Sequence, residues 1–258
     1  MTRVPLPEAF LRLPLTHRGY HDRGKGVIEN SLSAFRAAME AGYGIELDIQ
    51  LSADNQAVVF HDDTLDRVAE TTGLVQDRTA AELGRIRLKG SSDVIPSFAE
   101  TLALVAGRVP LLVELKDQSG IMNGTDGVLE RATVAALRGY QGPVALMSFN
   151  PDVVACLAEI APEWPRGIVT CSWGPEDAAT VGQARCDHLR AIPDYDRTQS
   201  SFISHELADL DFARVADLKT QGANILTWTV RSPQDEAFAR RIVHNITFEG
   251  YPAPFRAA

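Results

Sequence analysis

Short apolar runs alternate with helix-like segments along the whole of this chain, and that alternation limits its fold more than any other feature. The predicted strands are Leu13–His17, Ile45–Ile49, Ala57–His61, Val109–Leu115, Val144–Phe149, Gly167–Cys171, His188–Ile192, Ile225–Val230 and, near the end, Ile246–Phe248. Strands that alternate with helices favour a mostly parallel sheet whose strands are joined by helical crossovers.

The segments between these strands carry clear signals for helix ends. Ser31 can cap a helix that Gly42 ends, and capping boxes begin at Thr79 and Ser97. Prolines in the first turn follow two further caps, Asn150 and Ser232. About eight strands joined by such helices suit a (β/α)₈ barrel, and 258 residues are enough to build one.

An open, doubly wound sheet is the alternative architecture, but neither GxGxxG nor GxxxxGK[ST] follows a predicted strand. We therefore predict an α/β fold in which residues 1–258 form a single (β/α)₈ TIM-type barrel domain. The stretch from 64 to 97 lacks a clear strand. It is predicted to be a short excursion from the barrel that contains one short helix.

Composition and charge narrow the range of partners. Apolar content of 45% and charged content of 23% are ordinary for a soluble globular protein. A net charge of −9 argues against nucleic acid or an anionic membrane as a main partner, so local positive charge must attract any anionic substrate. No stretch approaches the ~20 apolar residues of a stable membrane span. Three cysteines without CxxC spacing and the absence of a leader pattern predict a cytoplasmic protein, and the oligomeric state stays open.

Charged residues recur at the ends of two predicted strands. Glu46 and Asp48 are two residues apart and therefore face the same side of their strand, and Glu114 and Lys116 repeat this spacing. Charged side chains near the C-terminal end of a barrel strand point to the mouth where barrel enzymes place their active sites. Strand-end charges that simply reach solvent are the alternative.

The position of His61 follows from the turn-rich stretch before it. The gap from Asp48 to His61 is about the minimum for a helical crossover, and its residues are not helix-like. A hairpin that turns at Asp54-Asn55 sets His61 opposite Asp48. The hairpin therefore predicts that His61 lies near the Glu46/Asp48 pair, whether or not its second arm belongs to the barrel.

Three carboxylates on converging strands repel one another strongly when they are partly buried. A divalent cation relieves this repulsion, and all-oxygen ligands indicate a hard ion, Mg²⁺ or Ca²⁺, held by Glu46, Asp48 and Glu114. With Arg18 and Lys116 charged and both histidines neutral, the three carboxylates and the bound metal give the site one net positive charge. That charge suits the single negative charge of a phosphodiester, whereas the same site without a metal would repel it.

Hydrolysis of a phosphodiester also requires proton transfer. The attacking hydroxyl must lose a proton and the leaving alkoxide must gain one. Histidine titrates near neutral pH, so His17 and His61 can supply a base and an acid together. A single histidine at a strand end would more often be structural, but two beside an acidic cluster favour catalysis.

These segments, in this order, resemble the glycerophosphodiester phosphodiesterase family. The motifs that carry the resemblance are HRG at 17–19, Glu29-Asn30 before a helix, ELD at 46–48, VVFHD at 58–62, ELK at 114–116, Ser148-Phe149, Trp228-Thr229-Val230 and Tyr251-Pro252. The resemblance implies a phospholipase-C-like barrel that hydrolyses a small-molecule glycerophosphodiester to glycerol 3-phosphate and an alcohol. It implies a divalent metal on the three carboxylates, acid–base catalysis by the two histidines and phosphate binding by Arg18 and Lys116.

The chain departs from the family pattern at two places. Ile28 stands where the family usually has proline, and Glu249-Gly250 stands where it usually has Thr-Asp, which leaves the role of Glu249 open. Phe149 and Trp228 are candidate walls of the substrate pocket, although packing in the core suits them equally well. Two rival functions are a related lipid phosphodiesterase that releases a cyclic phosphate and a non-catalytic barrel that binds a phosphorylated ligand.

Overall fold

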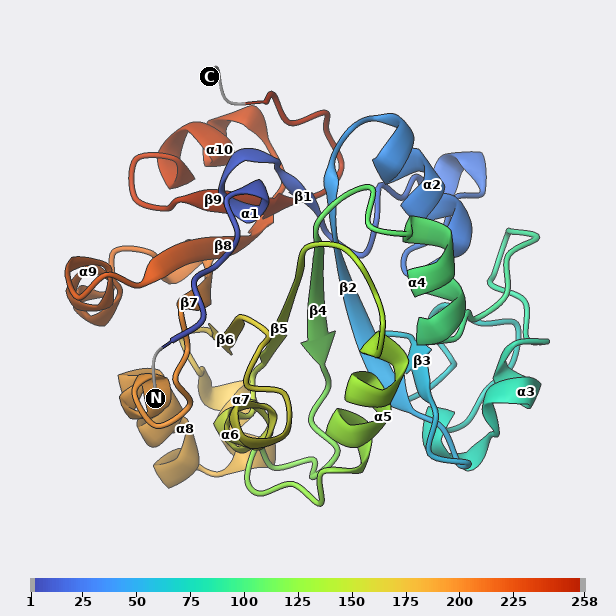
Figure 1. Cartoon of the computed structure of the whole chain (residues 1–258), viewed down its shortest axis with the longest axis horizontal. Helices are drawn as coiled ribbons and strands as arrows, with labels where there is room; N and C mark the ends of the chain where they lie inside the picture. Colours follow the sequence, from blue (N-terminus) through green and yellow to red (C-terminus); the bar gives the residue numbers. More distant parts are fainter. Residues whose placement is uncertain (1–2, 256–258) are drawn as a thin grey trace.

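Eight parallel strands close into a barrel in the computed structural model, which describes residues 3–255 (Figure 1). The barrel strands are β1 (Leu15–Thr16), β2 (Gly44–Leu51), β4 (Leu111–Leu115), β5 (Val144–Ser148), β6 (Arg166–Thr170), β7 (Phe202–Glu206), β8 (Asn224–Val230) and β9 (Asn245–Phe248). Around the barrel the order is β1, β9, β8, β7, β6, β5, β4 and β2, and pairing of β1 with β2 closes it. The predicted α/β barrel is confirmed.

Helices surround this barrel and connect its strands (Figure 1). The α-helices are α1 (Ala9–Arg12), α2 (Leu32–Glu40), α3 (Ala80–Leu83), α4 (Phe98–Val105), α5 (Val128–Leu137), α6 (Pro151–Ile160), α7 (Pro175–Val181), α8 (Gln183–Ala191), α9 (Ala213–Thr220) and α10 (Pro233–Ala239). Short 3₁₀ turns are η1 (Arg23–Lys25), η2 (Val75–Asp77), η3 (Pro193–Tyr195) and η4 (Leu207–Asp209). All five predicted caps accept the expected backbone hydrogen bonds.

One predicted strand is wrong. The segment from His188 to Ile192 belongs mostly to α8, because Cys186 and Leu189 share one helical face and pack together against Trp173. The barrel strand that follows β6 is instead β7 (Phe202–Glu206), which pairs with β6 and β8.

The predicted hairpin is present, with a small error in register. Strand β3 (Ala57–Val59) pairs antiparallel with β2 and lies outside the barrel. Ile49 is opposite Val59, and the carbonyl of Asp48 accepts a hydrogen bond from the Phe60 amide at 3.1 Å. Phe60, and not His61, therefore lies opposite Asp48, because the turn closes one position earlier than expected. His61 is the next residue along and stays close to the Glu46/Asp48 pair.

The excursion after β3 has a small apolar core of its own and contains α3, the single short α-helix predicted there. Side chains such as Leu65, Val75 and Leu83 pack there against Val58 and Phe60. Figure 1 shows this segment beside β3 at the outer edge of the barrel. The excursion thus holds the β3 arm in place, and with it the histidine that follows.

The interior of the barrel is apolar at one end and polar at the other. Leu15, Leu112, Phe202 and Leu226 fill the lower part together with Phe10 of α1. Above them, toward the C-terminal ends of the strands, charged and polar side chains share the interior with a smaller apolar wall. Such a barrel has a packed floor and a chemically reactive mouth.

Candidate active site

One pocket of about 350 Å³ lies in the barrel, toward the C-terminal ends of its strands. All nine side chains singled out in the sequence line this pocket. The parallel strands explain this gathering, because residues far apart in the chain reach the same end of the barrel when each lies near the end of its strand.

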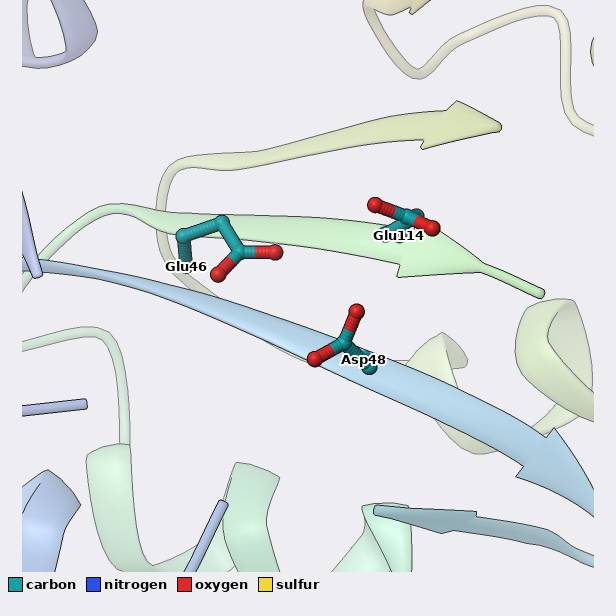
Figure 2. Close-up of side chains that lie close together, drawn as sticks. All are labelled: Glu46, Asp48 and Glu114. Atoms are coloured by element: carbon teal, nitrogen blue, oxygen red, sulfur yellow. The ribbon is translucent and has the colours of Figure 1, made fainter. Parts of the chain in front are cut away.

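Three buried carboxylates form one side of the pocket. Glu46 and Asp48 come from β2 and Glu114 from β4, and their side chains project into the same space in Figure 2. One oxygen from each lies within 4.8 Å of the others. Burial, followed by repulsion from the other two carboxylates, raises the pKa of Glu46 well above its usual range. The residues around Glu46 therefore stabilise its ionised form less well than water does.

Two cations approach this cluster. Lys116 Nζ lies 2.8 Å from Asp48 Oδ1 and 2.6 Å from Glu114 Oε1. Arg18 Nε lies 3.4 Å from Asp48 Oδ2, and the Arg18 backbone amide donates to Glu46 at 2.9 Å. Burial alone would raise the pKa of Asp48, but Lys116, with smaller contributions from His61 and Arg18, holds it well below its usual range. Neither cation compensates Glu46 fully.

His17 is held by a carboxylate from the other end of the chain. Its Nδ1 lies 2.6 Å from Oε2 of Glu249, whose other oxygen accepts a hydrogen bond from Arg231 at 2.7 Å. Burial alone would raise the pKa of Glu249, but the hydrogen bond from His17 leads a set of interactions that hold it far below its usual range. An ionised carboxylate can only accept, so Nδ1 of His17 carries a proton and Nε2 is the basic nitrogen.

His61 has an equivalent partner in the next residue. Its Nδ1 lies 2.7 Å from Asp62 Oδ1. Arg67 binds Asp62 through Nε at 2.6 Å and binds both oxygens of Glu29 at 2.7 Å. Glu29 in turn accepts from Arg18 at 2.7 Å, so one chain of ion pairs connects the His61 side of the pocket with the Arg18 side.

The three carboxylates fit a divalent cation. The donor set consists only of oxygen atoms, which Mg²⁺ and Ca²⁺ prefer. The raised pKa of Glu46, caused first by burial and then by its two carboxylate neighbours, shows that its ionised form lacks stabilisation, which a cation bound where the three ligand atoms converge would supply. Asn30 donates to Asp48 at 2.9 Å and so fixes the orientation of that carboxylate.

The opposite side of the pocket is partly apolar. Phe149 and Trp228 meet there edge to face, with ring centroids 5.4 Å apart, and Met147 and Val169 complete the wall. The Trp228 indole donates to the carbonyl of Ser204 at 3.1 Å, which fixes the ring against β7. Both candidate wall residues therefore line the pocket, and both also contact the core of the barrel.

Several partners in the site were not predicted. In the sequence, Glu249 stands out only as a departure from the family motif. Its contact with His17 joins residues 232 positions apart in the chain. Arg67 lies in the excursion with no local signal for its role. Asp62 lies in the VVFHD motif and Asn30 follows Glu29, but no sequence pattern indicates which groups they contact. The hairpin places Asp62 near the site, and the cap of α2 places Asn30 there.

Fold and site together define a class, that of (β/α)₈-barrel enzymes with an acidic cluster and two oriented histidines at the barrel mouth. The chain belongs to the glycerophosphoryl diester phosphodiesterase family, whose model matches residues 17–247. A glycerophosphodiester phosphodiesterase of Caldanaerobacter subterraneus subsp. tengcongensis is 33% identical over 61% of this chain and 66% of its own length. One from Bacillus altitudinis is 35% identical over 60% of this chain and 64% of its own length. The matched segments thus span just under two thirds of these relatives.

Solved structures agree with the fold. A phosphodiesterase of Oleispira antarctica, in complex with the product sn-glycerol-3-phosphate, has a TM-score of 0.74 and 24% identity, covering 93% of this chain and 94% of that one. A glycerophosphodiester phosphodiesterase of Parabacteroides distasonis has a TM-score of 0.71 and 23% identity, with 92% of each chain covered. Among residues 3–255, no helix combines the length and apolar character that crossing a membrane requires.

Proposed function

We propose that this chain is a metal-dependent hydrolase that converts small glycerophosphodiesters into sn-glycerol 3-phosphate and an alcohol. One observation carries the proposal: a single pocket contains three buried carboxylates, two cations and two histidines, each histidine bound through Nδ1 to its own carboxylate. Family membership and the product in the Oleispira antarctica structure support the same substrate class.

In this proposal Glu46, Asp48 and Glu114 hold Mg²⁺ or Ca²⁺. The bound cation would supply positive charge that offsets the charge of the phosphodiester and favours ionisation of the attacking water. Lys116 and Arg18 bind the non-bridging phosphate oxygens. Arg18 Nε is suited to this role because it is buried and has no hydrogen-bond partner within residues 3–255.

The two histidines transfer the protons. Burial lowers the pKa of His17, so its Nε2 is unprotonated near neutral pH and accepts a proton from the water that attacks phosphorus. His61 donates a proton from Nε2 to the leaving alkoxide, while Asp62 stabilises the charged ring. Phe149 and Trp228 form the apolar wall beside the substrate. We propose the cytoplasm as the place of this reaction.

Phosphorus-31 NMR of the products tests the proposal most simply. The enzyme, with Mg²⁺ or Ca²⁺ added, is incubated with glycerophosphodiesters that carry different alcohols. We expect the resonance of glycerol 3-phosphate to grow as that of the diester falls. A transient or final cyclic phosphate resonance would instead identify the cyclising phosphodiesterase, and binding without turnover across all substrates would identify a non-catalytic barrel.

A further inference from the structure

Two buried hydroxyl groups in the pocket have no assigned role. Ser204 on β7 and Thr247 on β9 both line it, with exposed fractions of 0% and 1%. Neither Ser204 Oγ nor Thr247 Oγ1 has a hydrogen-bond partner among residues 3–255. A buried hydroxyl that lacks a partner is costly, because it has lost its hydrogen bonds to water and gained none in return.

Ser204 lies on a strand that faces the acidic cluster, and Thr247 lies on a strand two places from it. Strands β9 and β7 are the neighbours of β8, which carries Trp228, and β7 stands across the barrel from β2, which carries Glu46 and Asp48. The adjacent residues His205 and Phe248 pack outside the barrel, so alternation along each strand directs Ser204 and Thr247 inward. A diester whose phosphate meets the cluster would extend one of its substituents toward these hydroxyls.

The chemistry of this wall matches a small polyol. Each hydroxyl can donate one hydrogen bond and accept others, and the two come from different strands, so they can hold two ligand hydroxyls at once. The ring of Trp228 between them offers an apolar surface for carbon-bound hydrogens. The space between these side chains is small, which suits a three-carbon unit better than a large headgroup.

We propose that Ser204 and Thr247 are specificity-determining residues that bind the two free hydroxyls of the glycerol unit. This inference rests on the proposed function in one respect, that the phosphate lies at the acidic cluster. The glycerol then occupies the closed part of the pocket in every substrate, while the variable alcohol leaves through the open side. Selectivity for glycerol and tolerance of different alcohols follow from this arrangement.

A pair of ligands that differ only in hydroxyl groups tests the inference. The dissociation constants of sn-glycerol 3-phosphate and n-propyl phosphate are measured by calorimetry on the enzyme with a divalent metal added. The wild-type enzyme should prefer glycerol 3-phosphate by about 10- to 100-fold, the sum of two neutral hydrogen bonds in a buried site. Equal affinity for the two ligands in the wild-type enzyme would overturn the proposal.

Variants assign the preference to each hydroxyl. S204A and T247V should each reduce the preference by about 3- to 10-fold through weaker binding of glycerol 3-phosphate, with binding of n-propyl phosphate unchanged. T247S keeps a hydroxyl and should retain the wild-type preference. The matched control is T227V, because Thr227 is a buried neighbour whose hydroxyl already donates to the His205 carbonyl at 2.7 Å. It should leave the preference unchanged.

An undiminished preference in both S204A and T247V would overturn the inference and assign the hydroxyls to ordered water or to the leaving alcohol. Turnover is measured separately. If no glycerophosphodiester is hydrolysed, the proposed function fails, while the ratio of the two dissociation constants still decides whether these hydroxyls recognise glycerol.

Discussion

Nδ1 of His17 lies 2.6 Å from Oε2 of Glu249, so the first barrel strand and the segment after the last one jointly form the proposed catalytic base. The carboxylate fixes the tautomer of the ring and leaves Nε2 as the basic nitrogen. The same carboxylate accepts from Arg231, which limits its movement. Glu249, which departs from the family motif, thus orients the ring of His17.

Replacement of Glu249 should reduce turnover without removing it. We expect E249A to lower kcat by about 10- to 100-fold, less than the 10²–10⁴-fold that general acid–base catalysis typically contributes, because His17 itself remains. E249Q keeps an acceptor for Nδ1 but loses the charge. Burial lowers the pKa of His17 and Glu249 opposes this effect, so E249Q should lower that pKa further and move the acidic limb of the kcat/KM profile to lower pH. An unmoved limb in both variants would contradict the role of Glu249.

Both histidines should be essential for turnover but not for the fold. We expect H17A and H61A each to lower kcat by about 10²–10⁴-fold, because each removes one proton-transfer group. Circular dichroism and calorimetric Mg²⁺ or Ca²⁺ binding should remain close to wild type. H188A is the control, since His188 is an exposed residue that pairs with Asp194 at 2.8 Å. Full activity in both H17A and H61A would rule out the paired-histidine mechanism.

Lys116 should compensate charge in the acidic cluster when no metal is bound. Its removal in K116M leaves three buried carboxylates without their nearest cation and should destabilise the metal-free protein by about 3–5 kcal/mol. A divalent metal then relieves more repulsion than in wild type, so the rise in Tm on metal addition should be larger in K116M. K25M, at an exposed ion pair, should respond like wild type. Equal Tm shifts in K116M and wild type would contradict this account.

Glu29 should make stability depend on pH. Burial alone would raise its pKa, but hydrogen bonds and ion pairs with Arg67 and Arg18 lower it to about 2 from 4.5. A depressed pKa in the folded state adds stability that is complete above 4.5 and is lost as pH falls toward 2. In urea unfolding, the free energy of unfolding of E29Q should be lower than that of wild type by about 2–3 kcal/mol at pH 7. This difference should shrink to about half near pH 3. A difference in unfolding free energy that stays constant from pH 7 to pH 3 would contradict an origin in the ion pairs of Glu29. E159Q is the control, because Glu159 is exposed, and its stability should follow that of wild type.

Local patterns predicted the parts of the site that depend on a single strand. Glu46 and Asp48, or Glu114 and Lys116, share a face because side chains alternate along a strand, and this periodicity is visible in the sequence. The barrel then brought these pairs together, as parallel topology requires. The same reasoning failed at His188–Ile192, where an apolar and polar alternation coincided with a helical face around Leu189.

Other features depend on contacts that no local pattern encodes. Strand β7 was missed because Ser204 and His205 make it less apolar than a buried strand usually is, although Thr170 and Asp209 satisfy the His205 ring. The one-residue error in the hairpin came from the turn, whose closure depends on the Ser52 side chain bonding the Gln56 amide. Long-range partners such as Glu249 appear only once the barrel closes.

Hydrolysis should require a divalent cation on Glu46, Asp48 and Glu114. The most direct test measures release of glycerol 3-phosphate by enzyme that has been stripped of metal with a chelator and dialysed, before and after Mg²⁺ or Ca²⁺ is added. We expect release to stop on metal removal and to return when either Mg²⁺ or Ca²⁺ is restored. Release that continues at the original rate in the stripped enzyme would contradict this requirement.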